Sequence, residues 1–301
     1  MSIAQRDSSQ DNIQRWLSPA KLNLMLRVLR RREDGYHDLQ TVFQLLDYGD
    51  EMWFSQSDSG EIEREYGGFE QLVSVEDDLC VKAIKALQDA AKQPLNVSIG
   101  LEKRLPMGGG IGGGSSNAAT TLMVVNKLWK LGFSRQELQK IGLSLGADVP
   151  VFIHGKSVWA EGVGEKFTDI SLPEVDYVVA TPNVHVSTAS IFQHKDVLKR
   201  LTKPQEAIKI RAFLDGHREN DLESIVRNEY PQVEETFQWL LKYKTDHFLP
   251  QMSGTGASVF LPVSDKQKGE EIIAQAPSFL RCFVARGVQQ HPIDDGVWPS
   301  G

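Results

Sequence analysis

Residues 105–122 read LPMGGGIGGGSSNAATTL, with six glycines in the seven residues from Gly108 to Gly114. Glycine has no side chain, so the backbone N–H groups of such a run stay uncovered. The run lies directly before a segment that is typical of a helix, and amides at a helix N-terminus bind anions. We therefore expect a loop that holds phosphate groups.

The flanking segments indicate that this loop belongs to a folded core and is not a flexible linker. Residues 95–101 alternate apolar and polar side chains, as a half-buried strand does. Residues 116–131 carry an apolar stripe and end at Gly132, which predicts a buried helix with a glycine stop. Linkers are flanked by polar sequence, whereas this loop lies between a strand and a core helix.

Two common phosphate-binding motifs fit the loop poorly. A Walker A motif needs a lysine directly after its last glycine, where this chain has Ser115 and Ser116. The glycines also satisfy G-x-G-x-x-G, but that match carries little weight inside a glycine run. The acidic residue that would hold a ribose about 20 positions later would fall near Phe133, between two predicted helices. A dinucleotide-binding sheet is therefore disfavoured.

Composition limits the class of protein. With 301 residues and 41% hydrophobic residues, the chain is long enough for about two domains with ordinary cores. The net charge of −7 argues against nucleic-acid binding. No charge-free stretch reaches membrane-spanning length, and the polar start MSIAQRDSSQDN is unlike a signal peptide. We expect a cytoplasmic protein without membrane or nucleic-acid partners, in which Cys80 and Cys282 are free thiols.

Two charged residues outside the loop attract attention, although each has an ordinary interpretation. Lys21 shares one face of a predicted strand with Asn23, and a lysine there is usually a solvated charge at a sheet edge. Asp148 follows a predicted helix that ends at Gly146 and precedes residues 149–153, which we predict as a short apolar strand. An aspartate at such a joint is commonly a turn residue.

The order of elements favours an α+β fold, because strands and helices come in runs without strict alternation. Residues 40–46 and 51–54 are predicted as two strands joined by a turn at residues 48–50. The pattern starts again near Phe167, and a second glycine turn lies at residues 252–256. We predict domains at residues 13–165 and 166–287, with mobile tails at 1–12 and 288–301.

Three stretches together resemble the GHMP kinase superfamily: SPAKLNL from Ser18, the glycine loop, and MSGTGASVF from Met252. Two more, RREDGYHDLQTVFQLLDYGD and GADVPVF, resemble one branch of it, which phosphorylates a cytidine diphosphate-linked methylerythritol. The resemblance implies an α+β, two-domain architecture with a ribosomal-S5-like N-terminal domain and a ferredoxin-like α+β C-terminal domain. It also implies ATP as co-substrate, with Mg²⁺, and transfer to the 2-hydroxyl of the methylerythritol unit in the non-mevalonate isoprenoid pathway.

The resemblance assigns site residues by position. Lys21 and Asp148 match the catalytic pair. The ATP phosphates would be held by the glycine loop, which we define as Pro106, Met107, Gly108, Gly109, Gly110, Ile111, Gly112, Gly113, Gly114, Ser115 and Ser116. The small-molecule substrate would be held by Asn23, Tyr36, His37, Thr188, Phe192 and Thr255, with the cytosine near Tyr36, His37 and Phe192. Metal ligands and oligomeric state stay unassigned.

Other interpretations stay open. Without the resemblance, Tyr36 is an aromatic residue of a surface turn and Phe192 is a core residue of its helix. The chain departs from the family pattern at Asp78, where asparagine is common on the adenine side. The alternatives are a GHMP kinase that acts on mevalonate, homoserine or a sugar, and a nucleotide-binding module without catalysis. The GYH block at Gly35 disfavours the first, and retention of both Lys21 and Asp148 disfavours the second.

Overall fold

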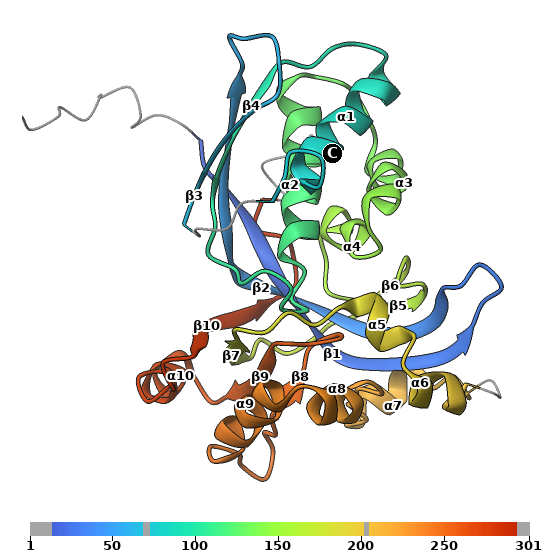
Figure 1. Ribbon diagram of the computed structural model, residues 1–301, viewed down its shortest axis with the longest axis vertical. Helices are drawn as coiled ribbons and strands as arrows, with labels where there is room; N and C mark the ends of the chain where they lie inside the picture. The colour runs from blue at the N-terminus through green and yellow to red at the C-terminus, as the bar shows by residue number, and fades with distance from the viewer. Residues whose placement is uncertain (1–13, 69–72, 202–204, 294–301) are drawn as a thin grey trace, which may run out of the picture.

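The computed structural model describes residues 14–68, 73–201 and 205–293. Over these residues, ten strands form one continuous sheet that runs through both halves of the chain (Figure 1). The strands are β1 (Trp16–Arg31), β2 (His37–Gln56), β3 (Glu63–Gly67), β4 (Val97–Glu102), β5 (Val158–Gly162), β6 (Lys166–Asp169), β7 (Asp176–Pro182), β8 (Gln251–Met252), β9 (Val259–Val263) and β10 (Leu280–Val288).

The helices fall into an N-terminal and a C-terminal group. The first group is α1 (Leu79–Ala91), α2 (Gly113–Leu128), α3 (Arg135–Leu145) and α4 (Val149–His154). These four helices lie together beside the strands β2 to β4 (Figure 1). The second group is α5 (Thr188–Phe192), α6 (Lys195–Arg200), α7 (Ile210–Leu214), α8 (Glu223–Glu229), α9 (Pro231–Leu241) and α10 (Lys266–Ile273).

Strand β2 is the centre of the sheet, because it pairs with β1, β4, β5 and β10. The order along the main path is β3-β4-β2-β10-β7-β9-β8, and β10 is the link between the halves. It pairs with β2 at Gly287 and Val288 and with β7 along Leu280 to Arg286. The C-terminal strand thus joins the two halves through backbone hydrogen bonds.

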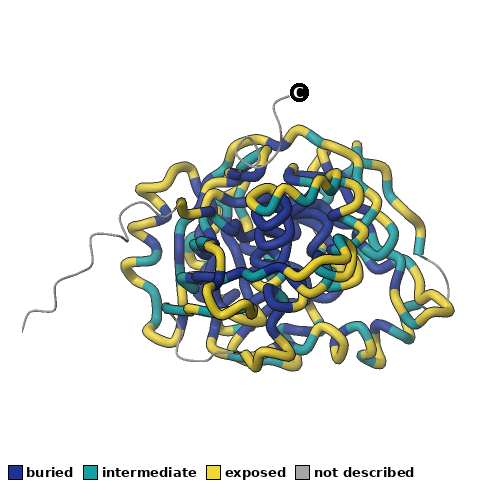
Figure 2. Tube along the Cα trace, turned by 90° about the horizontal axis from the view of Figure 1, so that it is seen from above, coloured by how far each residue is buried: buried dark blue, intermediate teal, exposed yellow. Residues whose placement is uncertain are grey.

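The buried residues form an N-terminal core, a C-terminal core and a cluster between them. Figure 2 shows these residues in dark blue at the centre of the molecule. The N-terminal core lies between the sheet and α1 to α4, and α2 is buried along most of its length. The cluster between the cores takes Leu22 and Val42 from the first half and Val179 and Phe260 from the second. The halves are therefore packed against each other through apolar side chains. The α+β expectation is confirmed.

The structure corrects the prediction of a turn at residues 48–50, because β2 runs through them without a break. Gly49 serves a different purpose, since a Cβ there would lie 2.0 Å from the carbonyl oxygen of Ser18. Its missing side chain lets β1 and β2 approach each other. Asp50, expected in a turn, is completely buried.

The predicted strand at residues 149–153 is wrong, because these residues form helix α4. Short apolar runs do not distinguish a strand from a buried helix. Pro150 in the first turn was the signal for a helix, because its fixed φ suits that position. Asp148 is consequently the residue that precedes a helix.

The domain division stays a prediction, but its boundary and its C-terminal tail fall on residues with regular contacts. The boundary at residue 166 divides a hairpin, because β6 pairs with β5 from Val158 to Glu161. The expected mobile tail from residue 288 does not hold for residues 289–293, since His291 and Ile293 are buried and His291 N donates to Gly155 O at 2.7 Å. Residues 1–12 and 294–301 lie outside the described part. No helix of the described part is long and apolar enough to span a bilayer.

Candidate active site

The glycine loop joins β4 to α2 and reaches its shape through left-handed glycines. Gly110 has φ +70°, and Gly112, which precedes the first residue of α2, has φ +77°. A Cβ on Gly110 would lie 2.5 Å from the Ser253 carbonyl oxygen, and a Cβ on Gly112 would lie 2.7 Å from the Phe152 ring. The glycines are therefore needed for close packing as well as for uncovered amides.

A cavity of about 400 Å³ opens along the glycine loop, and we call it the loop cavity. From the loop it is lined by Pro106, Met107, Gly108, Gly109, Gly110, Gly112, Gly113, Gly114 and Ser115. The rest of the wall comes from β3, from the end of β4 and from the start of α1, and it includes Tyr66, Lys103 directly after β4 and Asp78 directly before α1. An anion here would meet the N-terminus of α2, a helix of four turns.

Two of the predicted loop residues do not line this cavity. Ile111 is buried in the cluster between the cores. The Ser116 hydroxyl is fully buried and lies 2.9 Å from the Ser18 hydroxyl on β1, so it connects α2 to the sheet. Of the two serines that follow the glycines, Ser115 and Ser116, only Ser115 lines the cavity.

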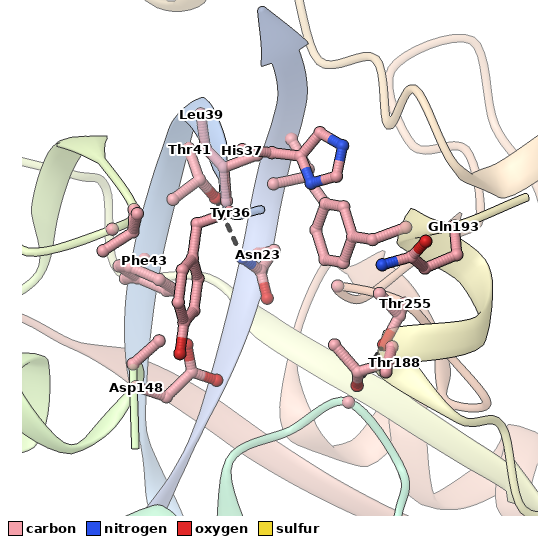
Figure 3. Close-up of a pocket in the computed structure, with 18 of the residues that line it drawn as sticks. Asn23, Tyr36, His37, Leu39, Thr41, Phe43, Asp148, Thr188, Gln193 and Thr255 are labelled. Atoms are coloured by element: carbon pink, nitrogen blue, oxygen red, sulfur yellow. Dashed lines mark hydrogen bonds between the residues drawn. The ribbon is translucent and has the colours of Figure 1, made fainter. Parts of the chain in front are cut away.

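A second cavity of about 650 Å³ lies on the other side of the loop, and we call it the aromatic cavity. All eight remaining predicted residues line it: Lys21, Asn23, Tyr36, His37, Asp148, Thr188, Phe192 and Thr255. They come from β1, the turn before β2, the first residue of β2, the start of α4, α5 and the turn at residues 252–256 (Figure 3). The fold thus gathers residues from both halves of the chain around one space.

Lys21 is buried in this cavity and has three polar partners. Its Nζ donates to Asn23 Oδ1 at 2.6 Å and to the Gly110 carbonyl oxygen at 3.0 Å. It also lies 3.2 Å from Asp148 Oδ2. A lysine that is only 2% exposed is not the solvated edge charge that β1 alone suggested. A buried ammonium group needs such partners, because burial of an unpaired charge is costly.

Asp148 supplies the anion of this pair from the start of α4. Its carboxylate makes no hydrogen bond to the backbone of α4, although aspartate often caps a helix in this way. The side chain is 37% exposed and faces the aromatic cavity. One face of the carboxylate is thus held by Lys21, and the carboxylate remains accessible to a molecule in the cavity.

Gly110 is the point where the two cavities meet, because it lines both. Thr188 also lines both, and its hydroxyl lies 3.0 Å from the Thr255 hydroxyl. The Lys21 ammonium bound to Gly110 therefore lies at the junction. A group transferred from a molecule in the loop cavity to one in the aromatic cavity would pass this ammonium.

The far end of the aromatic cavity carries flat side chains. His37 stacks on Phe192, with ring centroids 5.2 Å apart and planes inclined by 24°. Tyr36 projects from the turn before β2 and is 62% exposed, and Figure 3 shows it on the same side of the cavity as Asp148. Tyr36 and Phe192 both contribute to the cavity wall, where the predicted substrate site places them.

His37 is buried and its Nε2 has no hydrogen-bond partner among the described residues. Burial, followed by the positive charge of Arg31, lowers the pKa of His37 from its usual 6.5. The ring is thus neutral at pH 7, with one nitrogen as donor and the other as acceptor. A buried, unpaired ring nitrogen at a cavity wall is suited to bind a polar heterocycle.

The sequence predictions missed several residues that shape the site. Thr41 accepts from Asn23 Nδ2 at 2.8 Å, and the Phe43 ring lies 5.3 Å from Lys21 Nζ. Both lie on β2 on the face that lines the cavity. The alternation of β2 could have placed them together, but only once its pairing with β1 was known.

Ser253 is a further missed residue, and it connects the second glycine turn to the loop. Its hydroxyl donates to the Gly110 carbonyl oxygen at 3.0 Å and accepts from Asn23 N at 3.1 Å. Asn220 in turn donates to the carbonyl oxygens of Met252 and Gly254. The signal for Ser253 was its place in MSGTG, whereas nothing in the sequence pattern indicated Asn220.

The departure at Asp78 has a local structural explanation. Its carboxylate accepts from Cys80 N at 2.8 Å and pairs with Arg64 at 2.9 Å, so it caps α1. Asp78 also lines the loop cavity.

Burial raises the pKa of Cys80 to about 12, and both cysteines are free thiols, as predicted.

Comparisons with known proteins show the family to which the chain belongs. The model of the GHMP kinases N terminal domain matches residues 78–156, and that of the GHMP kinases C terminal matches residues 197–282. The 4-diphosphocytidyl-2-C-methyl-D-erythritol kinase of Shewanella woodyi is 44% identical over 279 residues, which cover 93% of this chain and 95% of that protein. The enzyme of that name from Pseudomonas aeruginosa strain LESB58 is 46% identical over 272 residues, 90% and 92% of the two chains.

Solved structures give the same result for the fold. A crystal structure of 4-(cytidine 5'-diphospho)-2C-methyl-D-erythritol kinase superposes with a TM-score of 0.73 at 29% identity, covering 91% of this chain and all of that one. Mevalonate kinase from Methanococcus jannaschii superposes with a TM-score of 0.67 at 13% identity over 93% of this chain and all of that one, which shows the shared fold alone. The chain belongs to the 4-diphosphocytidyl-2-C-methyl-D-erythritol kinases, small-molecule kinases of the GHMP kinase family.

Proposed function

We propose that this chain transfers the γ-phosphoryl group of ATP to the 2-hydroxyl of 4-diphosphocytidyl-2-C-methyl-D-erythritol. The observation that carries the proposal is the Lys21 and Asp148 pair, 3.2 Å apart, at the junction of the loop cavity and the aromatic cavity. Relatives with this activity in their names are 44% and 46% identical to the chain. Two free cysteines and ATP as substrate suit a cytoplasmic enzyme of isoprenoid precursor synthesis.

In this proposal ATP occupies the loop cavity. The uncovered amides of the glycine loop and the N-terminus of α2 bind the β and γ phosphates, because both present partial positive charge. The γ phosphate then lies toward Gly110, where the cavities meet. Lys21 reaches the same point and offsets the charge on the oxygens of the transferred group.

The acceptor occupies the aromatic cavity, with its alcohol beside Asp148. Phosphoryl transfer depends mainly on placing the acceptor oxygen in line with the phosphate. The Asp148 carboxylate accepts the proton of the hydroxyl or orients it, and Lys21 holds the carboxylate in place from 3.2 Å. The cytosine lies at the far end, against the stacked rings of His37 and Phe192 and beside Tyr36.

His37 gives this end of the cavity its polar contact. One nitrogen of the neutral ring can donate to or accept from an edge atom of cytosine, and Nε2 has no competing partner among the described residues. Base stacking contributes roughly 1–3 kcal/mol per base in nucleic-acid binders. A mevalonate molecule has no base, so it would leave this end of the cavity unfilled.

A magnesium ion fits the site only as a partner of the nucleotide. No group of three or more His, Cys, Asp or Glu side chains suited to a metal occurs in the described part of the chain. Mg²⁺ needs no such group when phosphate oxygens and water complete its coordination. The Ser115 hydroxyl, which lines the loop cavity, is the side chain that would hold it there. When bound, the metal would neutralise charge on the β and γ phosphates.

The test is ADP release with four acceptors, each with ATP: the cytidine diphosphate substrate, mevalonate, homoserine and galactose. We expect turnover with the first and background rates with the other three. If another acceptor is turned over faster than the cytidine diphosphate substrate, that acceptor is the substrate and the proposed one is wrong. Background rates with all four, together with tight ATP binding, would favour a nucleotide-binding module without catalysis.

A further inference from the structure

Asp50 on β2 is a buried carboxylate that the proposed reaction does not use. Its side chain is 0% exposed. One carboxylate oxygen accepts from the backbone N–H groups of Arg104 and Leu105, both at 2.8 Å. The other oxygen accepts from Lys103 Nζ. A buried charge with three donors is a specific arrangement, because burial without them would be costly.

These three donors lie at the entrance to the glycine loop. Arg104 and Leu105 directly precede Pro106, and Lys103 follows the last residue of β4. The Lys103 side chain lines the loop cavity, and its Nζ lies 3.2 Å from the position that a Cβ on Gly113 would occupy. Since Gly113 is the first residue of α2, the ammonium lies beside the predicted phosphate site.

Ser18, the residue opposite Asp50 on β1, contacts the helix that follows the glycine loop. In the register of β1 and β2, Ser18 pairs with Asp50. The Ser18 hydroxyl lies 2.9 Å from Ser116 Oγ and 2.6 Å from Asn117 Oδ1, both on α2. Two facing strand positions thus hold the entrance of the loop and the helix that follows it.

Charge adds a second argument for Lys103. In the described part of the chain, the charged side chains that line the loop cavity are Asp77, Asp78 and Lys103. Asp78 is neutralised by Arg64, Asp77 would repel a polyphosphate, and the net charge of the chain is −7. A nucleotide in this cavity needs a local cation, and Lys103 is the cation that its wall provides.

We propose that Lys103 is a nucleotide-binding cation of the loop cavity and that Asp50 positions both its ammonium group and the loop entrance. This inference rests on the proposed function for the identity of the nucleotide. It separates two tasks: Lys103 touches the phosphates, whereas Asp50 acts through Lys103 and the two backbone amides. Lys21 remains the cation of the transferred group on the other side of Gly110.

The experiment is calorimetric titration of ATP and of ADP into the full-length chain without acceptor, so that no turnover is needed. Lys103→Met should weaken ATP binding about tenfold through loss of a charge-assisted contact. Asp50→Asn keeps an oxygen for the two backbone donors but loses the charge that holds Lys103, so it should also weaken ATP binding. The double variant should bind ATP no more weakly than the single variant with the lower ATP affinity, because both changes act on one cation.

Each single change leaves one member of the pair uncompensated, so the double variant, which removes both charges, is the safest for folding. If a single variant does not fold, the double variant alone decides, again with about tenfold weaker ATP binding expected. Asp176→Asn is the matched control, because Asp176 is a buried carboxylate paired with Arg286 and lines neither cavity. It should lower the unfolding temperature and leave the ATP affinity unchanged.

Steady-state kinetics give the second readout. In Asp50→Asn and Lys103→Met, the KM for ATP should rise while the KM for the acceptor stays within about twofold, a split that a general loss of structure would not produce. Unchanged ATP affinity in folded Lys103→Met or in the double variant would overturn the role of Lys103. Tighter ATP binding by Asp50→Asn, or an equal loss for nucleotide and acceptor, would overturn the role of Asp50. If the unmodified chain shows no turnover with the four acceptors but the variants bind ATP more weakly, this inference stands and the proposed function is refuted.

Discussion

The Lys21 ammonium donates a 3.0 Å hydrogen bond to the carbonyl oxygen of Gly110. This contact joins the first strand of the chain to the glycine loop and places a cation where the two cavities meet. The Ser253 hydroxyl donates to the same carbonyl oxygen, so Gly110 is held from both halves of the chain. Changes at these residues should consequently affect catalysis and nucleotide binding in different proportions.

Asp148→Asn should lower kcat for ADP release by about 100-fold or more, because the amide cannot accept the proton of the acceptor hydroxyl. The KM for ATP should stay nearly constant, since Asp148 lines the aromatic cavity and not the loop cavity. Initial rates at saturating acceptor measure both quantities. Asp215→Asn, which breaks an exposed ion pair with Arg211, is the control. A wild-type rate in Asp148→Asn would exclude a catalytic role for this carboxylate.

Lys21→Met should lower kcat by about 100-fold and also raise the KM for ATP, because the ammonium contacts Gly110 as well as Asp148. Folding should survive, since the partner carboxylate of Asp148 is 37% exposed and can be solvated. Lys156→Met is the control, because Lys156 makes an exposed pair with Asp169. A loss confined to the KM for ATP would assign Lys21 to binding alone.

Gly110→Ala should destabilise the fold and abolish tight ATP binding. The new Cβ would lie 2.5 Å from the Ser253 oxygen and 2.6 Å from the Gly256 oxygen at φ +70°. The strained backbone alone costs about 1–3 kcal/mol.

Gly132→Ala is the matched control for this substitution, because Gly132 has φ +80° and no atom within 4 Å of a new Cβ. It should show the strain without the clash, with unchanged ATP affinity. Denaturant unfolding and ATP titration of both variants test the pair. Equal effects in the two variants would show that packing around Gly110 is unimportant.

The affinity for the acceptor should fall as the pH drops through the pKa of His37 in the folded chain, which burial lowers from 6.5, because protonated His37 loses its acceptor nitrogen. The same group contributes to stability. Its pKa is lower in the folded chain than the 6.5 of the unfolded chain, so the unfolded state takes up the proton first as the pH falls. The contribution is complete above about pH 6.5 and is lost as the pH falls from there toward the folded value.

A profile of the acceptor KM between pH 5 and 8 measures this dependence. His37→Gln should flatten it, whereas His217→Gln should not, since His217 lines neither cavity. A profile that His37→Gln leaves unchanged would assign the titration to another group.

Local signals in the sequence were sufficient for much of the fold. The capping box of Ser134 and Glu137 begins α3, and the glycine run precedes α2 as expected. Alternation placed Lys21 and Asn23 on one face, where they form a 2.6 Å hydrogen bond. Each of these features depends on neighbours within a few residues, so a pattern can report it.

The features that the patterns missed depend on distant parts of the chain. Residues 48–50 have the composition of a turn, but Gly49 and Asp50 pair with Pro19 and Ser18 of β1, so β2 continues through them as a strand. The burial of Lys21 depends on Gly110, Phe43 and Asp148, which the fold brings to it. Ser116 illustrates the same limit, because its hydroxyl turns to Ser18 on a strand that only the tertiary structure places beside it.

The contacts of Ser253 determine how the two halves of the molecule can move. Its hydroxyl bonds both β1 and the glycine loop, and Ser258 N, at the end of the same turn, donates to the Gly109 carbonyl oxygen at 3.0 Å. A hinge motion between the halves would have to break these bonds at the reaction centre itself. The halves should therefore unfold in one cooperative transition. Substrates should enter through movement of peripheral segments, while the two halves keep their relative orientation around the proposed catalytic centre.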